Sequence, residues 1–109
     1  MADATGLSRQ HAVIIHLKLS DLNFGSFEER ETAFRLEDRL ESALTDVGVG
    51  EYDGHEFGSG WCQLYIYGAS ANAIADAILP VVRAFAPRVG SFVVKRFGPP
   101  GAPEEQLPL

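Results

Sequence analysis

The chain has 109 residues, of which 46% are hydrophobic and 22% are charged. This balance is typical of one globular domain and excludes a disordered or fibrous chain. The formal net charge of −6 repels phosphate backbones, so we expect no nucleic-acid partner.

The single cysteine, Cys62, excludes an internal disulfide and a CxxC metal or redox site. The N-terminal sequence MADATGLSRQ has no apolar segment of the kind that directs export, and the apolar runs elsewhere are short. We therefore expect a cytoplasmic protein that does not insert into membranes.

Residues 11–20, HAVIIHLKLS, alternate in polarity and predict a strand, with Ile14, His16 and Lys18 on its more polar face. A helix is predicted to begin after Ser26, because SFEE is a capping box in which Ser26 and Glu29 each accept from the other's backbone amide. Apolar residues recur at helical spacing up to Val47. Gly48 follows where a left-handed cap is needed.

Residues 50–57 and 61–67 flank the sequence GSG and predict a β-hairpin. With Gly58 and Ser59 as the turn, Glu56 is expected opposite Trp61 and His55 opposite Cys62. A one-residue bulge would change these faces. In the second strand of the hairpin, alternation directs one set of side chains inward (Cys62, Leu64, Ile66) and another outward (Trp61, Gln63, Tyr65, Tyr67).

Residues 70–87, SANAIADAILPVVRAFAP, predict a second helix with Ser70 as N-cap and a kink at Pro80. The segment GSFVVKRFG, residues 90–98, predicts the last strand. Residues 99–109, PPGAPEEQLPL, are rich in proline, which lacks a backbone donor, so we expect a flexible tail outside the sheet.

The predicted order is strand, helix, strand, strand, helix, strand. From His11 to Gly98 the chain resembles ferredoxin-like (split βαβ) domains, and its segments YDGHEFGSG, LYIYG and VVKRFGPPG are similar to those of uncharacterised bacterial domains. The resemblance implies an α+β fold, βαββαβ, with a four-stranded antiparallel sheet in the order 4-1-3-2 and both helices on one face. Residues 1–10 are then a flexible N-terminus, 11–98 a single domain and 99–109 the tail.

Helices on one side of a sheet leave its other side open. Six residues are expected on that side and are the predicted binding residues: His16, Lys18, Trp61, Gln63, Tyr65 and Tyr67. An uncovered aromatic face is typical of a surface that contacts a partner, and Tyr and Trp suit such surfaces. We expect a homodimer formed through this face.

Acidic residues are concentrated in one part of the chain. Residues 28–56 hold ten acidic side chains and three arginines. Such a surface favours a basic protein partner, as in an immunity-type protein that captures a basic toxin. The alternative is an exposed helix whose acids only interact with water.

Asp53, His55 and Glu56 are the candidate catalytic residues. Asp53 and His55 project to the same side of a strand, so the carboxylate could orient the imidazole as a general base or the pair could bind a metal. The chain has no HExxH or HxH pattern, and we predict no metal and no cofactor. The alternative is a polar strand edge.

Two functions follow. The sequence favours a small non-enzymatic binding or regulatory protein, a homodimer that acts through its aromatic sheet face and its acidic helix and hairpin. The alternative is a small-molecule enzyme or ligand sensor, with Asp53 and His55 as the base and Tyr65, Trp61 and His16 as the binding wall. It predicts one concave pocket that holds these groups together.

Overall fold

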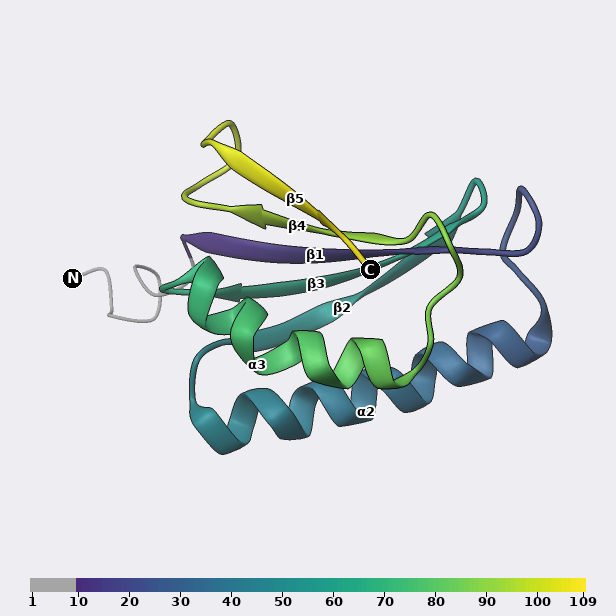
Figure 1. Ribbon diagram of the computed structural model, residues 1–109, viewed down its shortest axis with the longest axis horizontal. Coiled ribbons are helices and arrows are strands. Elements are labelled where there is room, and N and C mark those ends of the chain that lie inside the picture. The colour runs from purple at the N-terminus through teal and green to yellow at the C-terminus, as the bar shows by residue number, and fades with distance from the viewer. Residues whose placement is uncertain (1–9) are drawn as a thin grey trace.

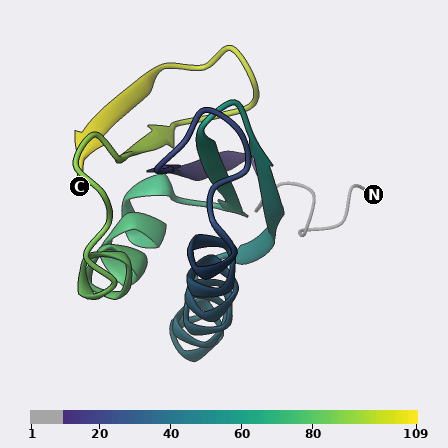
Figure 2. The same cartoon turned by 90° about the vertical axis from the view of Figure 1, so that its right-hand side faces the viewer.

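The computed structural model describes residues 10–109. Five strands, β1 (His11–Lys18), β2 (Glu51–Gly58), β3 (Trp61–Gly68), β4 (Phe92–Arg96) and β5 (Glu104–Pro108), form one antiparallel sheet. Two helices, α2 (Phe27–Val47) and α3 (Ala71–Ala84), lie side by side on one face of it (Figures 1 and 2). Residues 1–9 of the predicted flexible N-terminus lie outside the described residues.

The predicted four-stranded ferredoxin-like sheet in the order 4-1-3-2 is wrong. The sheet has five strands in the order β2-β3-β1-β4-β5, because the proline-rich tail returns along β4. The reversal is a turn in which the Ala102 amide donates to the Pro99 carbonyl at 2.9 Å and Gly101 takes a φ of 97°. Strand β5 then pairs with β4 from Arg96–Glu104 to Phe92–Pro108. Prolines are compatible with this position, because the outer side of an edge strand needs no ladder donor.

Both predicted helix N-caps are confirmed. The Ser26 hydroxyl accepts from the Glu29 amide at 3.1 Å, and the Glu29 carboxylate accepts from the Ser26 amide at 2.8 Å. Gly48 ends α2 with a φ of 67°, a conformation that costs glycine little. The Ser70 hydroxyl accepts from the Ala73 amide at 3.2 Å and begins α3.

The hairpin turns one residue later than predicted. Ser59 and Gly60 form the two-residue loop with φ values of 53° and 86°, as a type I′ turn requires. Glu56 therefore lies opposite Gln63, and His55 lies opposite Leu64 instead of Cys62. A bulge between Tyr52 and Gly54 interrupts the pairing at Asp53.

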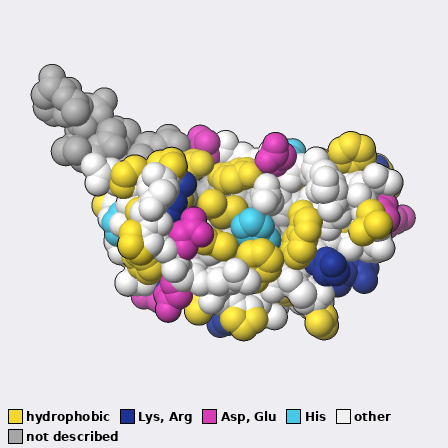
Figure 3. Space-filling model, turned by 90° about the horizontal axis from the view of Figure 1, so that it is seen from above, with side chains coloured by type: hydrophobic (Ala, Val, Ile, Leu, Met, Phe, Trp, Pro, Cys, Tyr) yellow, Lys and Arg dark blue, Asp and Glu magenta, His cyan; other side chains and the backbone are white. Residues whose placement is uncertain are grey.

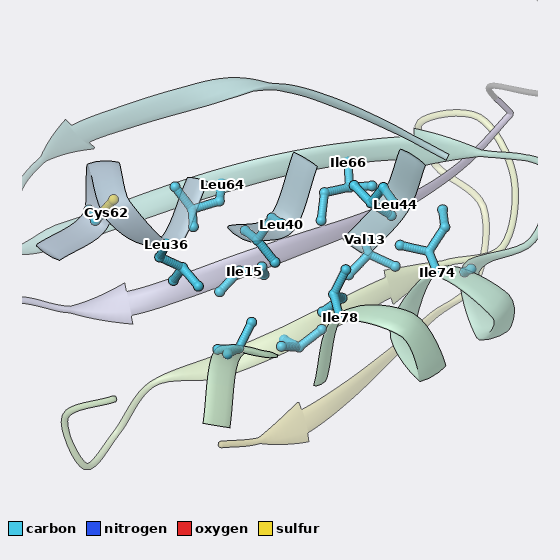
Figure 4. Close-up of a cluster of buried hydrophobic side chains, with 14 of the residues drawn as sticks. Val13, Ile15, Leu36, Leu40, Leu44, Cys62, Leu64, Ile66, Ile74 and Ile78 are labelled. Carbon is cyan, nitrogen blue, oxygen red and sulfur yellow. The ribbon is translucent and has the colours of Figure 1, made fainter. Parts of the chain in front are cut away.

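The core lies between the sheet and the two helices (Figure 4). The inward set on β3 is confirmed, since Cys62, Leu64 and Ile66 are each 0% exposed. They contact the apolar stripe of α2, which consists of Ala33, Leu36, Leu40 and Leu44, and that of α3, which includes Ile74, Ile78 and Val82. This core occupies one side of the sheet only and leaves the outward residues free to form a surface.

Candidate functional site

The face of the sheet opposite the helices is built from rows of side chains that run across the strands. One row consists of Glu56, Gln63, His16, Phe92 and Pro108, and the next of Gly54, Tyr65, Ile14, Val94 and Gln106. Figure 3 looks onto this face and shows apolar side chains gathered around a histidine. We call this surface the open face.

An aromatic cluster occupies one end of the open face. The His16 ring stacks on Phe92 with ring centres 4.4 Å apart and planes 12° from parallel. Trp61 meets both rings edge-on, at 6.3 Å from His16 and 5.5 Å from Phe92. The Lys18 ammonium lies 5.1 Å from the centre of the Trp61 ring, within range of a cation–π interaction.

A chain of hydrogen bonds runs beside the cluster, across β2, β3 and β1. The Tyr65 hydroxyl lies 3.0 Å from Glu56 Oε1 and 2.8 Å from Gln63 Oε1, and donates its single proton to one of them at a time. The Gln63 amide nitrogen lies 3.2 Å from His16 Nδ1. Since Gln63 Oε1 faces Tyr65, its amide group donates to His16 and leaves the ring proton on Nε2.

The environment of His16 favours the neutral ring. Burial lowers the pKa of His16, and the charge of Glu104 on β5 opposes this only in part. The pKa of Tyr65 is raised to about 12, first by burial and then by its bond to Glu56. The open face at neutral pH is therefore aromatic and largely uncharged at its centre.

A second polar cluster lies on the other side of the sheet, under α2. Glu37 Oε2 accepts from the Tyr52 hydroxyl and lies 2.7 Å from His55 Nδ1. The side chain of Glu37 is 14% exposed and that of His55 is 37% exposed. Phe34 and Phe57 flank the His55 ring at 5.5 and 5.3 Å. Burial, with the Glu37 carboxylate, raises the pKa of Tyr52.

The structure divides the predicted site residues between the two sides of the sheet. Five of the six predicted binding residues form the cluster and the hydrogen-bonded chain of the open face, and Tyr67 lies two positions further along β3. Glu56 joins them through Tyr65. His55 lies opposite Leu64 on the helix side, and Asp53 stands at the bulge. The base and the binding wall of the enzyme alternative are therefore not brought together.

Two residues of these clusters escaped the sequence analysis. Glu37 supplies the carboxylate that bonds to His55. The sequence does contain a sign of this role: Glu37 is a charged residue within the apolar stripe of α2, four residues after Ala33 and three before Leu40. Phe92 is in a continuous apolar run, where alternation cannot distinguish the two faces. Its place follows only from its pairing with His16.

The structure shows no metal-ligand cluster. Within residues 10–109, no three His, Cys, Asp or Glu side chains are grouped so that they would hold a metal ion. Over the same residues, no helix has both the length and the apolar character needed to cross a bilayer.

Comparisons with known proteins add no relative: no family model, curated protein or solved structure matches this chain.

Proposed function

We propose that the protein is a non-enzymatic binding protein that forms a homodimer through its open face. The observation that carries this proposal is the aromatic cluster of His16, Trp61 and Phe92 on a sheet face that neither helix covers. Stacked aromatic rings on an open surface bury large apolar areas when a partner packs on them.

The two edges of the sheet are poorer contact surfaces than its face. Strand β2 carries a bulge and the acids Glu51, Asp53 and Glu56. Strand β5 is five residues long, with Glu104, Glu105 and Pro108. Bulges, charges and prolines on edge strands oppose pairing with another strand. A partner is therefore expected to stack on the face.

The size of the open face fits such a contact. With strands about 4.8 Å apart and a rise of about 3.3 Å per residue, the strands of the sheet cover roughly 500 Å² in projection. Side chains add to this projected area, and each partner in a stable interface buries ~800 Å².

The charges on the open face suit a second copy of the chain. Lys18 lies at one end of the face, in the row of Trp61. Glu51 and Glu104 lie at the other end, in the row of Tyr67 and Arg96. A two-fold axis in the plane between two stacked sheets, perpendicular to the strands, sets each Lys18 over the acidic end of the other copy.

Sedimentation equilibrium tests the homodimer. Trp61→Ala removes the ring that touches His16, Phe92 and Lys18. Loss of a tryptophan that is buried in an interface costs about 2 kcal/mol, or roughly thirtyfold in dissociation constant. Phe34→Ala is the control, because Phe34 is exposed on α2. A wild-type protein that stays monomeric at high micromolar concentration refutes the dimer, and an unchanged dissociation constant in Trp61→Ala refutes the open face as its interface.

A basic protein partner is a second candidate, favoured by the outer surface of α2. Asp38, Glu41 and Asp46 lie on one face of α2, next to Ser42 and Thr45. No basic residue lies in the last turn of α2, where the helix dipole favours a cation and disfavours Asp46. Salt-sensitive binding of an oligolysine peptide, lost when Asp38, Glu41 and Asp46 are replaced by their amides, tests this candidate.

A further inference from the structure

The unequal lengths of the two helices create a cavity at one end of the molecule. Helix α2 has 21 residues and α3 has 14, so at about 1.5 Å per residue α2 is about 10 Å longer. The first turns of α2 extend past the C-terminal end of α3, on the right-hand side of Figure 1, which faces the viewer in Figure 2. The segment 85–88 crosses back toward the sheet there and forms one side of an open cavity of about 420 Å³.

The floor of this cavity is apolar. Leu17 of β1, Leu36 of α2, Val82 of α3 and Phe85 line it. Cys62 also belongs to its wall and is itself fully buried. Burial raises the pKa of the Cys62 thiol to about 12, so the thiol is neutral at physiological pH. The volume is in the range of roughly 300–1,000 Å³ that small-molecule sites have, and the floor suits an alkyl or aryl group.

At the mouth of the cavity, the Glu29 carboxylate is already occupied. Its Oε1 accepts from the Ser20 hydroxyl at 2.6 Å and from the Ser26 amide at 2.8 Å, and its Oε2 accepts from the Ser20 amide at 3.0 Å. These bonds fix the loop between β1 and α2. They leave Glu29 with little capacity to accept from a ligand.

Arg88 and Thr32 are the donors at the mouth that face the helix side. Lys18 also lines the cavity, but its ammonium lies 5.1 Å from the centre of the Trp61 ring, on the open face. Arg88 forms a long ion pair with Glu29, with 3.8 Å between an Arg88 nitrogen and Glu29 Oε2; this is beyond hydrogen-bond distance, and the Arg88 side chain is 50% exposed. Thr32 Oγ1 accepts from Arg35 at 3.0 Å, so its own proton is available to donate. The exposed carboxylate of Glu28 also lines the mouth and disfavours a doubly charged head group such as a phosphate.

We propose that this cavity binds a small apolar monocarboxylic acid, with its tail on the partly exposed side chains of Leu17 and Phe85 and its carboxylate on Arg88 and Thr32. A planar guanidinium matches a carboxylate better than it matches an alcohol or an amine. The site lies on the helix side of the sheet and does not depend on the open face.

Calorimetric titration with octanoate, octan-1-ol and octylamine tests the proposal, since the three probes share one alkyl chain and differ in the head group. Octanoate is expected to bind about tenfold more tightly than the alcohol, a moderate factor because Arg88 is half exposed. Arg88→Gln removes this preference. Arg83→Gln is the matched control, because Arg83 is an exposed arginine in the last turn of α3 that does not line the cavity.

Filling the cavity tests the position of the tail. Ala33 lines the cavity and is 4% exposed, so Ala33→Met places a flexible side chain inside it and abolishes binding. Ala43→Met, on the same helix outside the cavity, leaves binding unchanged. Circular dichroism verifies that each variant is folded. Absence of saturable octanoate binding, equal affinity for all three probes, or octanoate binding that survives Ala33→Met in folded protein overturns the proposal.

Discussion

Replacing Glu37 by glutamine tests whether the cluster under α2 holds the hairpin against the helix. Glu37 comes from α2, whereas Tyr52 and His55 come from β2, the strand at the edge of the sheet. Both side chains bond to the same carboxylate oxygen, Oε2. Glu37→Gln keeps one carbonyl oxygen as an acceptor, removes the charge and replaces the other oxygen by an amide NH2 group. Glu37→Ala removes the acceptor altogether.

The expected cost follows from this geometry. A hydrogen bond to a charged acceptor contributes about 1.5–3 kcal/mol and a neutral one about half as much. Two bonds are weakened in Glu37→Gln, and His55 is 37% exposed, so solvent reduces its share. We expect Glu37→Gln to lower the free energy of unfolding by about 1–2 kcal/mol. Glu37→Ala leaves the half-buried Tyr52 hydroxyl without its acceptor and should lower it by about 2–4 kcal/mol.

Urea denaturation at pH 7, followed by circular dichroism, measures these differences as shifts of midpoint at constant slope. Glu41→Gln is the matched control: it removes a charge one turn further along α2 from an exposed side chain, and such changes stay within about 0.5 kcal/mol. Equal effects of Glu37→Gln and Glu41→Gln would show that the cluster does not stabilise the fold. A Glu37→Ala variant as stable as Glu37→Gln would show that the neutral acceptor of glutamine contributes nothing.

Three further predictions concern the core, a turn and the fifth strand. The pKa of the Cys62 thiol is about 12 in the folded protein and 9.0 when unperturbed. The folded state therefore holds this proton more tightly than the unfolded state. The contribution of the neutral thiol to the free energy of unfolding is complete below roughly pH 9 and is lost as the pH rises from there toward 12. The free energy of unfolding should fall by about 1 kcal/mol per pH unit there. In denaturation curves between roughly pH 8 and 10, Cys62→Ala should show a shallower fall, because only the dependence due to Tyr52 and Tyr65, whose pKa values are also raised, remains. Gly60→Ala should cost about 2 kcal/mol in urea denaturation, because φ is +86° and a Cβ would lie 2.9 Å from the Asp21 carbonyl; a cost below about 0.5 kcal/mol contradicts this reason. Deleting residues 104–109 removes β5 with the half-buried Leu107, and should lower the free energy of unfolding by about 1–2 kcal/mol; an unchanged urea midpoint contradicts a stabilising role for β5.

The parts of the fold that depend on near neighbours in the chain are readable in the sequence. Ser26 and Glu29 satisfy each other's backbone amides within four residues, and Gly48 ends the same helix because glycine tolerates the left-handed conformation. The alternation of Cys62 and Leu64 with their outward neighbours likewise follows from the period of a single strand. Each of these features is decided by interactions over a few residues.

Contacts between segments that are distant in the sequence decided the remaining features of the fold and of the candidate sites. Strand β5 has weak strand propensity and exists because the unpaired edge of β4 accepts it, which a pattern within residues 104–108 does not reveal. The one-residue shift of the hairpin turn accompanies the packing of Gly60 against the loop at Asp21. Glu37 bonds to His55, which is 18 residues away in the sequence. The cavity beside Arg88 exists because α2 extends beyond the end of α3. Such features depend on which surfaces come into contact when the sheet and the helices pack together, and a pattern within a few residues does not determine those contacts.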